Sequence, residues 1–104
     1  MPSLDEIIQQ PVRLRLMAAL VAIKSGESAE FTLLRDLLGT TDGNLGAHLR
    51  RLEEAGYIEI TKKFVDRKPR TFIAATALGR KVFRNQVAAL EEILHGAAGV
   101  KGRK

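Results

Sequence analysis

Apolar residues recur at helical spacing along the first quarter of the chain. The apolar positions of residues 4–9 fall on one helical face, and the acidic residues near their start favour a helix N-terminus. Pro11 separates this short helix from a longer one, which is predicted over residues 12–24. Two adjoining apolar rows in the longer helix indicate that it is buried on much of its circumference, and Ser25-Gly26 is expected to end it.

Two shorter helices are predicted next, with their start signals close together. Phe31 is expected to begin a very short strand, and Thr32 is a candidate N-cap for a leucine-rich helix. A second capping signal at residues 40–42 opens a helix over residues 43–55, whose leucines recur at i, i+4 and i+7. Two short helices joined by a tight turn form a helix-turn-helix, expected at about 32–55.

The apolar period changes to two after Gly56, whose residue type suits the left-handed position that follows a helix. Alternation over residues 57–62 predicts a strand, and residues 71–75 predict its partner. The intervening residues 63–70 hold a proline, an aspartate and four basic residues, so they are expected to form an exposed hairpin tip. The whole strand pair, including the tip, spans about 57–76.

A final helix is predicted from residue 77 to about 95, with Thr76 as its cap and an apolar stripe along one side. Residues 96–104 are small, glycine-rich and basic, and we expect them to form a flexible basic tail. The fold class is therefore α+β, mainly α. Residues 1–95 are expected to form a single domain.

The order of these elements resembles the winged helix-turn-helix superfamily over nearly the whole chain. Residues 41–58 are similar to the recognition helix and following strand of MarR-like and ArsR-like bacterial and archaeal regulators, through the motifs Asp-Gly-Asn-Leu, His-Leu and Glu-Ala-Gly-Tyr. Residues 67–71 and 76–80 also resemble compact winged helix DNA-binding domain proteins, which lack a separate ligand domain. The resemblance implies a transcriptional regulator that binds DNA through its recognition helix and its wing, the basic hairpin.

Composition and charge support a DNA-binding function and argue against an enzyme or a metal-binding protein. With 104 residues there is room for one domain, and the net charge of +5 with a pI near 10.0 favours a polyanionic partner. The absence of cysteine excludes disulfides and thiolate metal sites. No clustered carboxylates, nucleophile–base pair, phosphate-cradling glycine motif or metal spacing is present, so we expect no enzyme, no cofactor and no metal. Without a signal peptide or a long apolar run, the protein is expected to be cytoplasmic and nucleoid-associated when bound to DNA.

The recognition helix offers small and polar residues on the face opposite its leucines, given a rotation of about 100° per residue. Thr41, Asn44 and Arg50 are the best candidates for base contacts, whereas the carboxylate of Asp42 would repel phosphate and is expected to cap the helix. The full set of candidate contacts is Thr41, Gly43, Asn44, Ala47, His48, Arg50 and Arg51.

Other roles remain open for some of these residues. Arg50 and Arg51 could instead form a solvated face that pairs with Glu53 and Glu54. His48 could contact a phosphate, as the histidine at this place in the resembling families often does, or it could be structural.

The hairpin holds the densest positive charge in the chain. Such a tip can lie along the DNA backbone or reach into the minor groove, where arginine is favoured in narrow A·T-rich stretches. The alternative is a loop made basic for solubility. The candidate wing contacts are Lys62, Lys63, Arg67, Lys68 and Arg70.

The first segment and the last helix carry more apolar surface than a minimal winged helix needs. In the resembling families these elements pair across a two-fold axis, which places two recognition helices in major grooves about 34 Å apart. The competing explanation is packing of the last helix against residues 12–24 of the same chain. The candidate dimerisation residues are Leu4, Ile7, Ile8, Phe83, Val87, Leu90 and Leu94.

The function expected from the sequence is a homodimeric, sequence-specific regulator that binds double-stranded DNA. A repressor is favoured over an activator, because no part of the sequence is left to recruit polymerase. Two alternatives remain: an architectural DNA binder of low specificity, and a winged-helix subunit that binds another protein. A small-molecule effector is also possible, although no residue indicates one.

Overall fold

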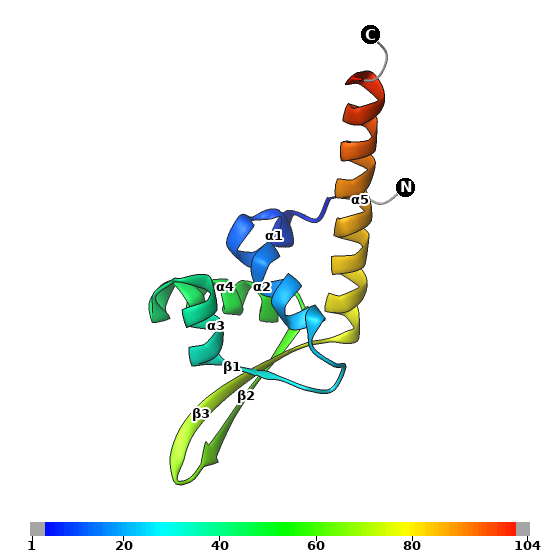
Figure 1. The fold of residues 1–104 in the computed structure, drawn as a ribbon. Coiled ribbons are helices and arrows are strands. Elements are labelled where there is room, and N and C mark those ends of the chain that lie inside the picture. Colours follow the sequence, from blue (N-terminus) through cyan, green and yellow to red (C-terminus); the bar gives the residue numbers. More distant parts are fainter. Residues whose placement is uncertain (1–3, 102–104) are drawn as a thin grey trace.

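Helices pack around a small antiparallel sheet in the computed structural model, which describes residues 4–101, with side-chain environments for residues 4–96 (Figure 1). The mainly helical α+β class predicted from the sequence is confirmed. The elements are α1 (Glu6–Gln9), α2 (Pro11–Ala22), β1 (Ala29–Glu30), α3 (Phe31–Leu38), α4 (Asp42–Glu54), β2 (Ile58–Val65), β3 (Lys68–Ala75) and α5 (Ala77–Lys101). The strand order in the sheet is β1-β3-β2.

The first helix begins two residues later than predicted, at Glu6, and the second begins one residue earlier, at Pro11. The Asp5 side chain accepts hydrogen bonds from the backbone N–H groups of Ile7 and Ile8, and Pro11 is the first residue of α2, where a missing N–H costs nothing. The end of α2 was predicted two residues too late. Ile23 is already extended, so the helix ends before the Ser25-Gly26 turn and not at it. Gly26 has a φ of 91° in this separate turn.

The start of α3 differs from the prediction. The short strand lies before Phe31, at Ala29–Glu30, where it pairs with β3. Phe31 is the first residue of α3 and Glu30 is its N-cap, so the expected N-cap at Thr32 is wrong. The Thr32 hydroxyl instead donates to the Glu30 side chain at 3.1 Å. This boundary is set by pairing with a strand far along the chain, which a local capping pattern does not report.

The turn between α3 and α4 contains a left-handed residue and a hydroxyl cap. Gly39 ends α3 with φ 62°. Thr41 caps α4, because its hydroxyl oxygen accepts the backbone N–H of Asn44 at 3.2 Å. The cap expected at Asp42 is therefore wrong: Asp42 is the first helical residue, where its carboxylate is favourable to the helix dipole.

The strands of the β2–β3 hairpin are longer, and its turn is shorter, than predicted. Its strands stay in register from Ile58↔Ala75 to Val65↔Lys68, so the turn is only Asp66 and Arg67. Both turn residues have positive φ, 52° and 67°, as a two-residue type I′ loop requires. The tip predicted over residues 63–70 is therefore mostly paired strand. Figure 1 shows this hairpin reaching well beyond the helices.

The last helix also exceeds the prediction. It was expected to end at about residue 95, but α5 continues to Lys101, so a flexible tail starting at residue 96 is wrong for residues 96–101. The sequence in this stretch includes alanines, which have the highest helix propensity and offset the glycines. Residues 102–104 of the expected tail lie outside the described residues.

The core lies where α1, α2, α3 and α4 meet one face of the sheet. The side chains of Leu16, Leu20, Leu45 and Ile73 are fully buried there. Burial of a leucine or isoleucine side chain contributes about 1.5–3 kcal/mol. The core therefore fixes α4 by its leucine side and leaves its opposite side facing solvent.

The first turn of α5 packs directly on the start of β2. Thr76 caps α5 by accepting the Gly79 N–H at 2.9 Å, and its own hydroxyl donates to the Gly56 carbonyl at 2.7 Å. A Cβ atom added at Gly79 would lie 2.0 Å from the Tyr57 carbonyl oxygen, so only glycine fits. This contact sets how α5 leaves the winged domain.

We expect Gly79→Ala to lower the free energy of unfolding by at least about 2 kcal/mol, because the added methyl group meets backbone that cannot move aside. Urea unfolding at one fixed protein concentration measures the change. The matched control is Gly96→Ala, also in α5, where nothing lies within 4 Å of an added Cβ and a gain of about 0.5–1 kcal/mol is expected. Equal midpoints for Gly79→Ala and the wild type would contradict the close contact.

Candidate nucleic-acid interface

Helix α4 turns its predicted recognition face to solvent. Leu45, Leu49 and Leu52 are at most 2% exposed and hold the helix against the core. The residues on the other side that the sequence singled out are exposed, namely Thr41, Gly43, Asn44, Ala47, Arg50 and Arg51. The predicted orientation of the helix is confirmed, and contact of these residues with DNA remains a prediction.

The glycines of α4 are not explained by packing within the chain. An added Cβ at Gly43 would meet nothing within 4 Å, and at Gly46 it would meet only the end of the Arg50 side chain, at 3.7 Å. Neither glycine has positive φ. Their small size instead leaves the helix backbone open to close approach from outside.

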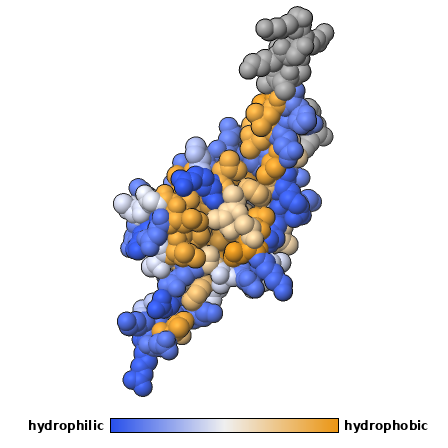
Figure 2. All heavy atoms as spheres, in the orientation of Figure 1, coloured by the Kyte–Doolittle hydropathy of each residue, from blue (hydrophilic) through white to orange (hydrophobic). Residues whose placement is uncertain are grey.

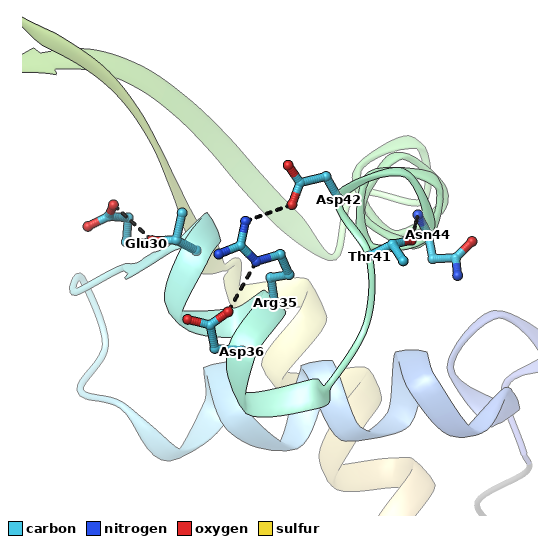
Figure 3. A network of polar contacts seen from close by, with 7 residues as sticks. Glu30, Arg35, Asp36, Thr41, Asp42 and Asn44 are labelled. Carbon is cyan, nitrogen blue, oxygen red and sulfur yellow. Dashed lines mark hydrogen bonds and ion pairs between the residues drawn. The ribbon is translucent and has the colours of Figure 1, made fainter.

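A charge cluster at the start of α4 joins it to α3 (Figure 3). Arg35 of α3 donates to the Asp42 carboxylate at 2.9 Å and to Asp36 at 3.1 Å. The pair with Arg35 offsets the negative charge that Asp42 would otherwise present to an approaching phosphate. Asn44 points away from this cluster and from Arg35 (Figure 3), so its amide is not taken up by the network.

His48 lies on the flank of α4 in contact with α2. Its Nδ1 is 3.2 Å from the Arg13 guanidinium, which also donates to the Ile7 carbonyl. Burial, and then the positive charge of Arg13, lower the pKa of His48, so the ring is neutral at pH 7. A neutral, half-buried histidine beside an arginine favours the structural role among the two considered for His48.

The wing cations divide into an exposed set and one paired residue. Lys62, Lys63, Arg67 and Lys68 are exposed, and the Nζ of Lys63 lies 4.5 Å from the centre of the Phe72 ring. Arg70 differs, because its guanidinium is 2.7 Å from a Glu30 carboxylate oxygen.

The Arg70–Glu30 pair ties the hairpin to the edge strand β1. The hydrogen bond from Arg70, followed by the one from Thr32, lowers the pKa of the Glu30 carboxyl, so the pair is charged at neutral pH. Arg70 therefore serves mainly to hold the wing against β1. Its positive charge is already paired, so it is less available to a ligand than the sequence indicated.

The predicted dimerisation residues differ in how far they are exposed. Ile8 is fully buried within the chain, so its assignment to a dimer surface is wrong, and Ile7 and Phe83 pack partly against the same core. Along α5, by contrast, Val87 is 36% exposed and Leu94 is 67% exposed, joined by Ile93 at 55%. Figure 2 shows hydrophobic atoms along this helix. Leu4 and Leu90 are half-buried.

Sequence reasoning missed three residues near these surfaces: Arg13, Arg35 and Phe64. The two arginines act through partners distant in sequence, and no local pattern marks such partners. Phe64 could have been found by extending the alternation of the strand beyond Lys62, which places it on the same face as Ile58.

None of the helices formed by the described residues combines the length and the apolar composition that a membrane-spanning segment needs. Within the same part of the chain, no group of three acidic or histidine side chains is arranged to hold a metal ion.

Comparison with known proteins agrees with this geometry. The chain is 37% identical to the uncharacterized protein MJ0432 of Methanocaldococcus jannaschii over 82 residues, which cover 79% of this chain and 86% of that protein. A solved structure of a transcriptional regulator homologue from Pyrococcus horikoshii OT3 superposes with a TM-score of 0.80 at 31% identity, covering 89% of each chain.

A second solved structure has the same fold at lower identity. It is that of a transcriptional regulator of the MarR family from Enterococcus faecalis V583, with a TM-score of 0.69 at 24% identity, covering 94% of this chain and 84% of that one.

The family assignment follows from these matches together with the helix-turn-helix and basic hairpin described above. The family model for the winged helix DNA-binding domain matches residues 12–94. Its members are DNA-binding regulators rather than enzymes. The chain belongs to the winged helix DNA-binding domain family.

Proposed function

We propose that this protein is a homodimeric repressor that recognises a specific sequence in double-stranded DNA. The observation that carries the proposal is the combination of an exposed, small-residue face on α4 with an exposed cationic hairpin. Both lie away from the C-terminal half of α5 (Figure 1), so one duplex could contact both while α5 stays free to pair.

Base readout is assigned to α4. The side chains of Asn44 and Arg50 are exposed, and these residue types form bidentate pairs with adenine and guanine in the major groove. The glycines of α4 let the backbone come close to the base edges. Thr41 accepts a helix N–H through its hydroxyl oxygen and keeps its hydroxyl hydrogen for a phosphate.

Backbone contact is assigned to the wing. Lys62, Lys63, Arg67 and Lys68 are free of salt bridges to the described carboxylates, so their charges are available to neutralise phosphates. Arg67 sits in the two-residue turn, the part of the hairpin farthest from the core. Neutralising phosphates releases counterions, which makes this contribution dependent on salt but independent of sequence.

Dimerisation is assigned to α5. The helix has 25 residues, and its exposed Ile93 and Leu94 lie in the half that projects away from the other elements (Figure 1). A projecting helix without tertiary contacts is only marginally stable in water. Packing against the α5 of a second copy would cover its apolar side and place two α4 helices on one duplex.

Repression is the mode of transcriptional regulation that needs the fewest contacts beyond those with DNA. A dimer bound across a promoter excludes polymerase by occupying the DNA. No additional contact with the transcription machinery is required.

Selection from a random pool of duplex DNA tests sequence recognition. We expect an inverted repeat whose half-sites are about one helical turn apart. Arg50→Ala should alter the preferred base at one position in each half-site, because it removes a base contact, whereas Arg51→Ala on the flank should weaken all sequences alike. Binding without any selected motif would contradict sequence-specific recognition and favour an architectural role.

Replacing Arg67 tests the electrostatic role of the wing. For Arg67→Ala we expect weaker binding to every sequence, and a slope of log K against log salt that is smaller by about 1, because one phosphate contact is lost. Fluorescence anisotropy over a salt series measures both quantities. Lys24→Ala, which removes an exposed cation from the loop after α2, is the control and should keep the wild-type slope. The same slope in Arg67→Ala would remove the wing from the interface.

Replacing an exposed residue of α5 tests the dimer. Leu94→Asp should convert a species of twice 11.4 kDa into one of 11.4 kDa, because it places a charge in the proposed apolar seam. Light scattering coupled to size exclusion measures the mass. Leu33→Asp is the matched control, since Leu33 is 61% exposed but lies on α3, and it should leave the dimer intact. A monomeric wild type would contradict this proposal.

A further inference from the structure

Phe64 is the most exposed large hydrophobic residue in the described part of the chain. Its side chain is 76% exposed, on a hairpin whose other exposed residues near the tip are mainly cationic. Single exposed apolar residues are common on protein surfaces, so exposure alone assigns no role. The placement of this ring and the charges around it do indicate one.

Phe64 continues the apolar face of the sheet beyond the helices. Side chains alternate along β2, so Phe64 lies on the same face as Ile58, which is 2% exposed, and Ile60, which packs partly against the core. The cross-strand neighbour of Phe64 is Pro69, close to the turn. Figure 1 shows the end of the hairpin extending beyond the helices. Phe64 is two residues before the turn at Asp66 and Arg67, which agrees with its exposure of 76%.

The charges around Phe64 indicate which kind of molecule it contacts. Lys62, Lys63, Arg67 and Lys68 surround it in sequence and in the ladder, while Asp66 is the one acidic residue of the hairpin tip. A second copy of this chain would bring the same positive charge and be repelled. Polyanionic DNA is complementary to the cations and also offers an apolar site, because the stacked base pairs can be partly opened from the minor groove.

The hairpin presents this ring in a defined position. Its register is fixed up to a two-residue turn, and the Arg70–Glu30 pair ties the half of β3 nearer the turn to β1. On the face opposite Phe64, the Lys63 ammonium group lies over the Phe72 ring. A preorganised hairpin loses little conformational freedom on binding, so the contact of the ring would contribute most of its free energy to affinity.

We propose that Phe64 is a wedge that enters the minor groove beside the sequence read by α4 and partly unstacks one base step. This inference rests on the proposed function and adds a residue and a type of readout to it. Pyrimidine–purine steps such as TA and CA unstack most easily, so a preference for such a step is expected at a flanking position that no side chain reads by hydrogen bonds.

A tryptophan probe tests the insertion directly, because the chain contains no tryptophan. In Phe64→Trp the indole should lose emission on binding the selected duplex, as stacking against bases quenches it. Thr61→Trp is the matched control, since Thr61 is also exposed on β2 but lies on the opposite face, and its emission should stay nearly constant. Unchanged emission of Phe64→Trp in a saturated complex would overturn the wedge.

Affinity measurements separate this inference from the proposed function. Phe64→Ala should bind the selected duplex about 10-fold more weakly, with an unchanged salt slope because no charge is lost, and Phe64→Leu should recover much of the affinity. Wild-type affinity in Phe64→Ala would overturn the wedge and leave the regulator intact. If the wild type binds no duplex at all, the proposed function itself fails.

Discussion

The side chain of Asp5 joins three elements that the chain order keeps apart. One carboxylate oxygen caps α1, and the other accepts the Tyr57 hydroxyl at 2.6 Å at the start of β2. The backbone N–H of Asp5 donates to Gln86 of α5, a residue only 1% exposed. Burial, then the hydrogen bond and charge of Asp5, raise the pKa of Tyr57 to about 12, so the hydroxyl remains a donor at physiological pH. These hydrogen bonds fix the relative positions of the wing, α1 and α5.

Most of the fold could be predicted because local signals and periodicity agree in this sequence. Leucine spacing located α4, and Gly56 adopts the positive φ expected for a residue that follows a helix. The errors occur where distant pairing decides. Cross-strand pairing extends β2 and β3 through residues 63–65 and 68–70, whose charges resemble those of a loop. Likewise, β1 forms at Ala29–Glu30 because β3 offers it an edge.

The part of the candidate interface that depends on local periodicity could also be predicted from the sequence. The exposed side of α4 follows from which residues are buried, so Asn44 and Arg50 were placed correctly on the surface. Whether a charge is free depends on its neighbours in space. From the sequence alone, Arg67 and Arg70 are equally good candidates for phosphate contacts. In the fold, Arg67 is exposed, whereas Arg70 pairs with Glu30, which lies forty residues earlier in the chain.

The glycine contact at the root of α5 has a consequence for geometry at long range. A helix of 25 residues is about 37 Å long, so a change of about 5° in its direction at Gly79 moves its far end by about 3 Å. In a dimer joined through α5, that movement alters the separation of the two α4 helices by a comparable amount. The spacing between half-sites would then depend on Gly79, which is buried against the backbone of Tyr57. Operator spacing could therefore change in evolution through the packing at Gly79, with the recognition helix left as it is.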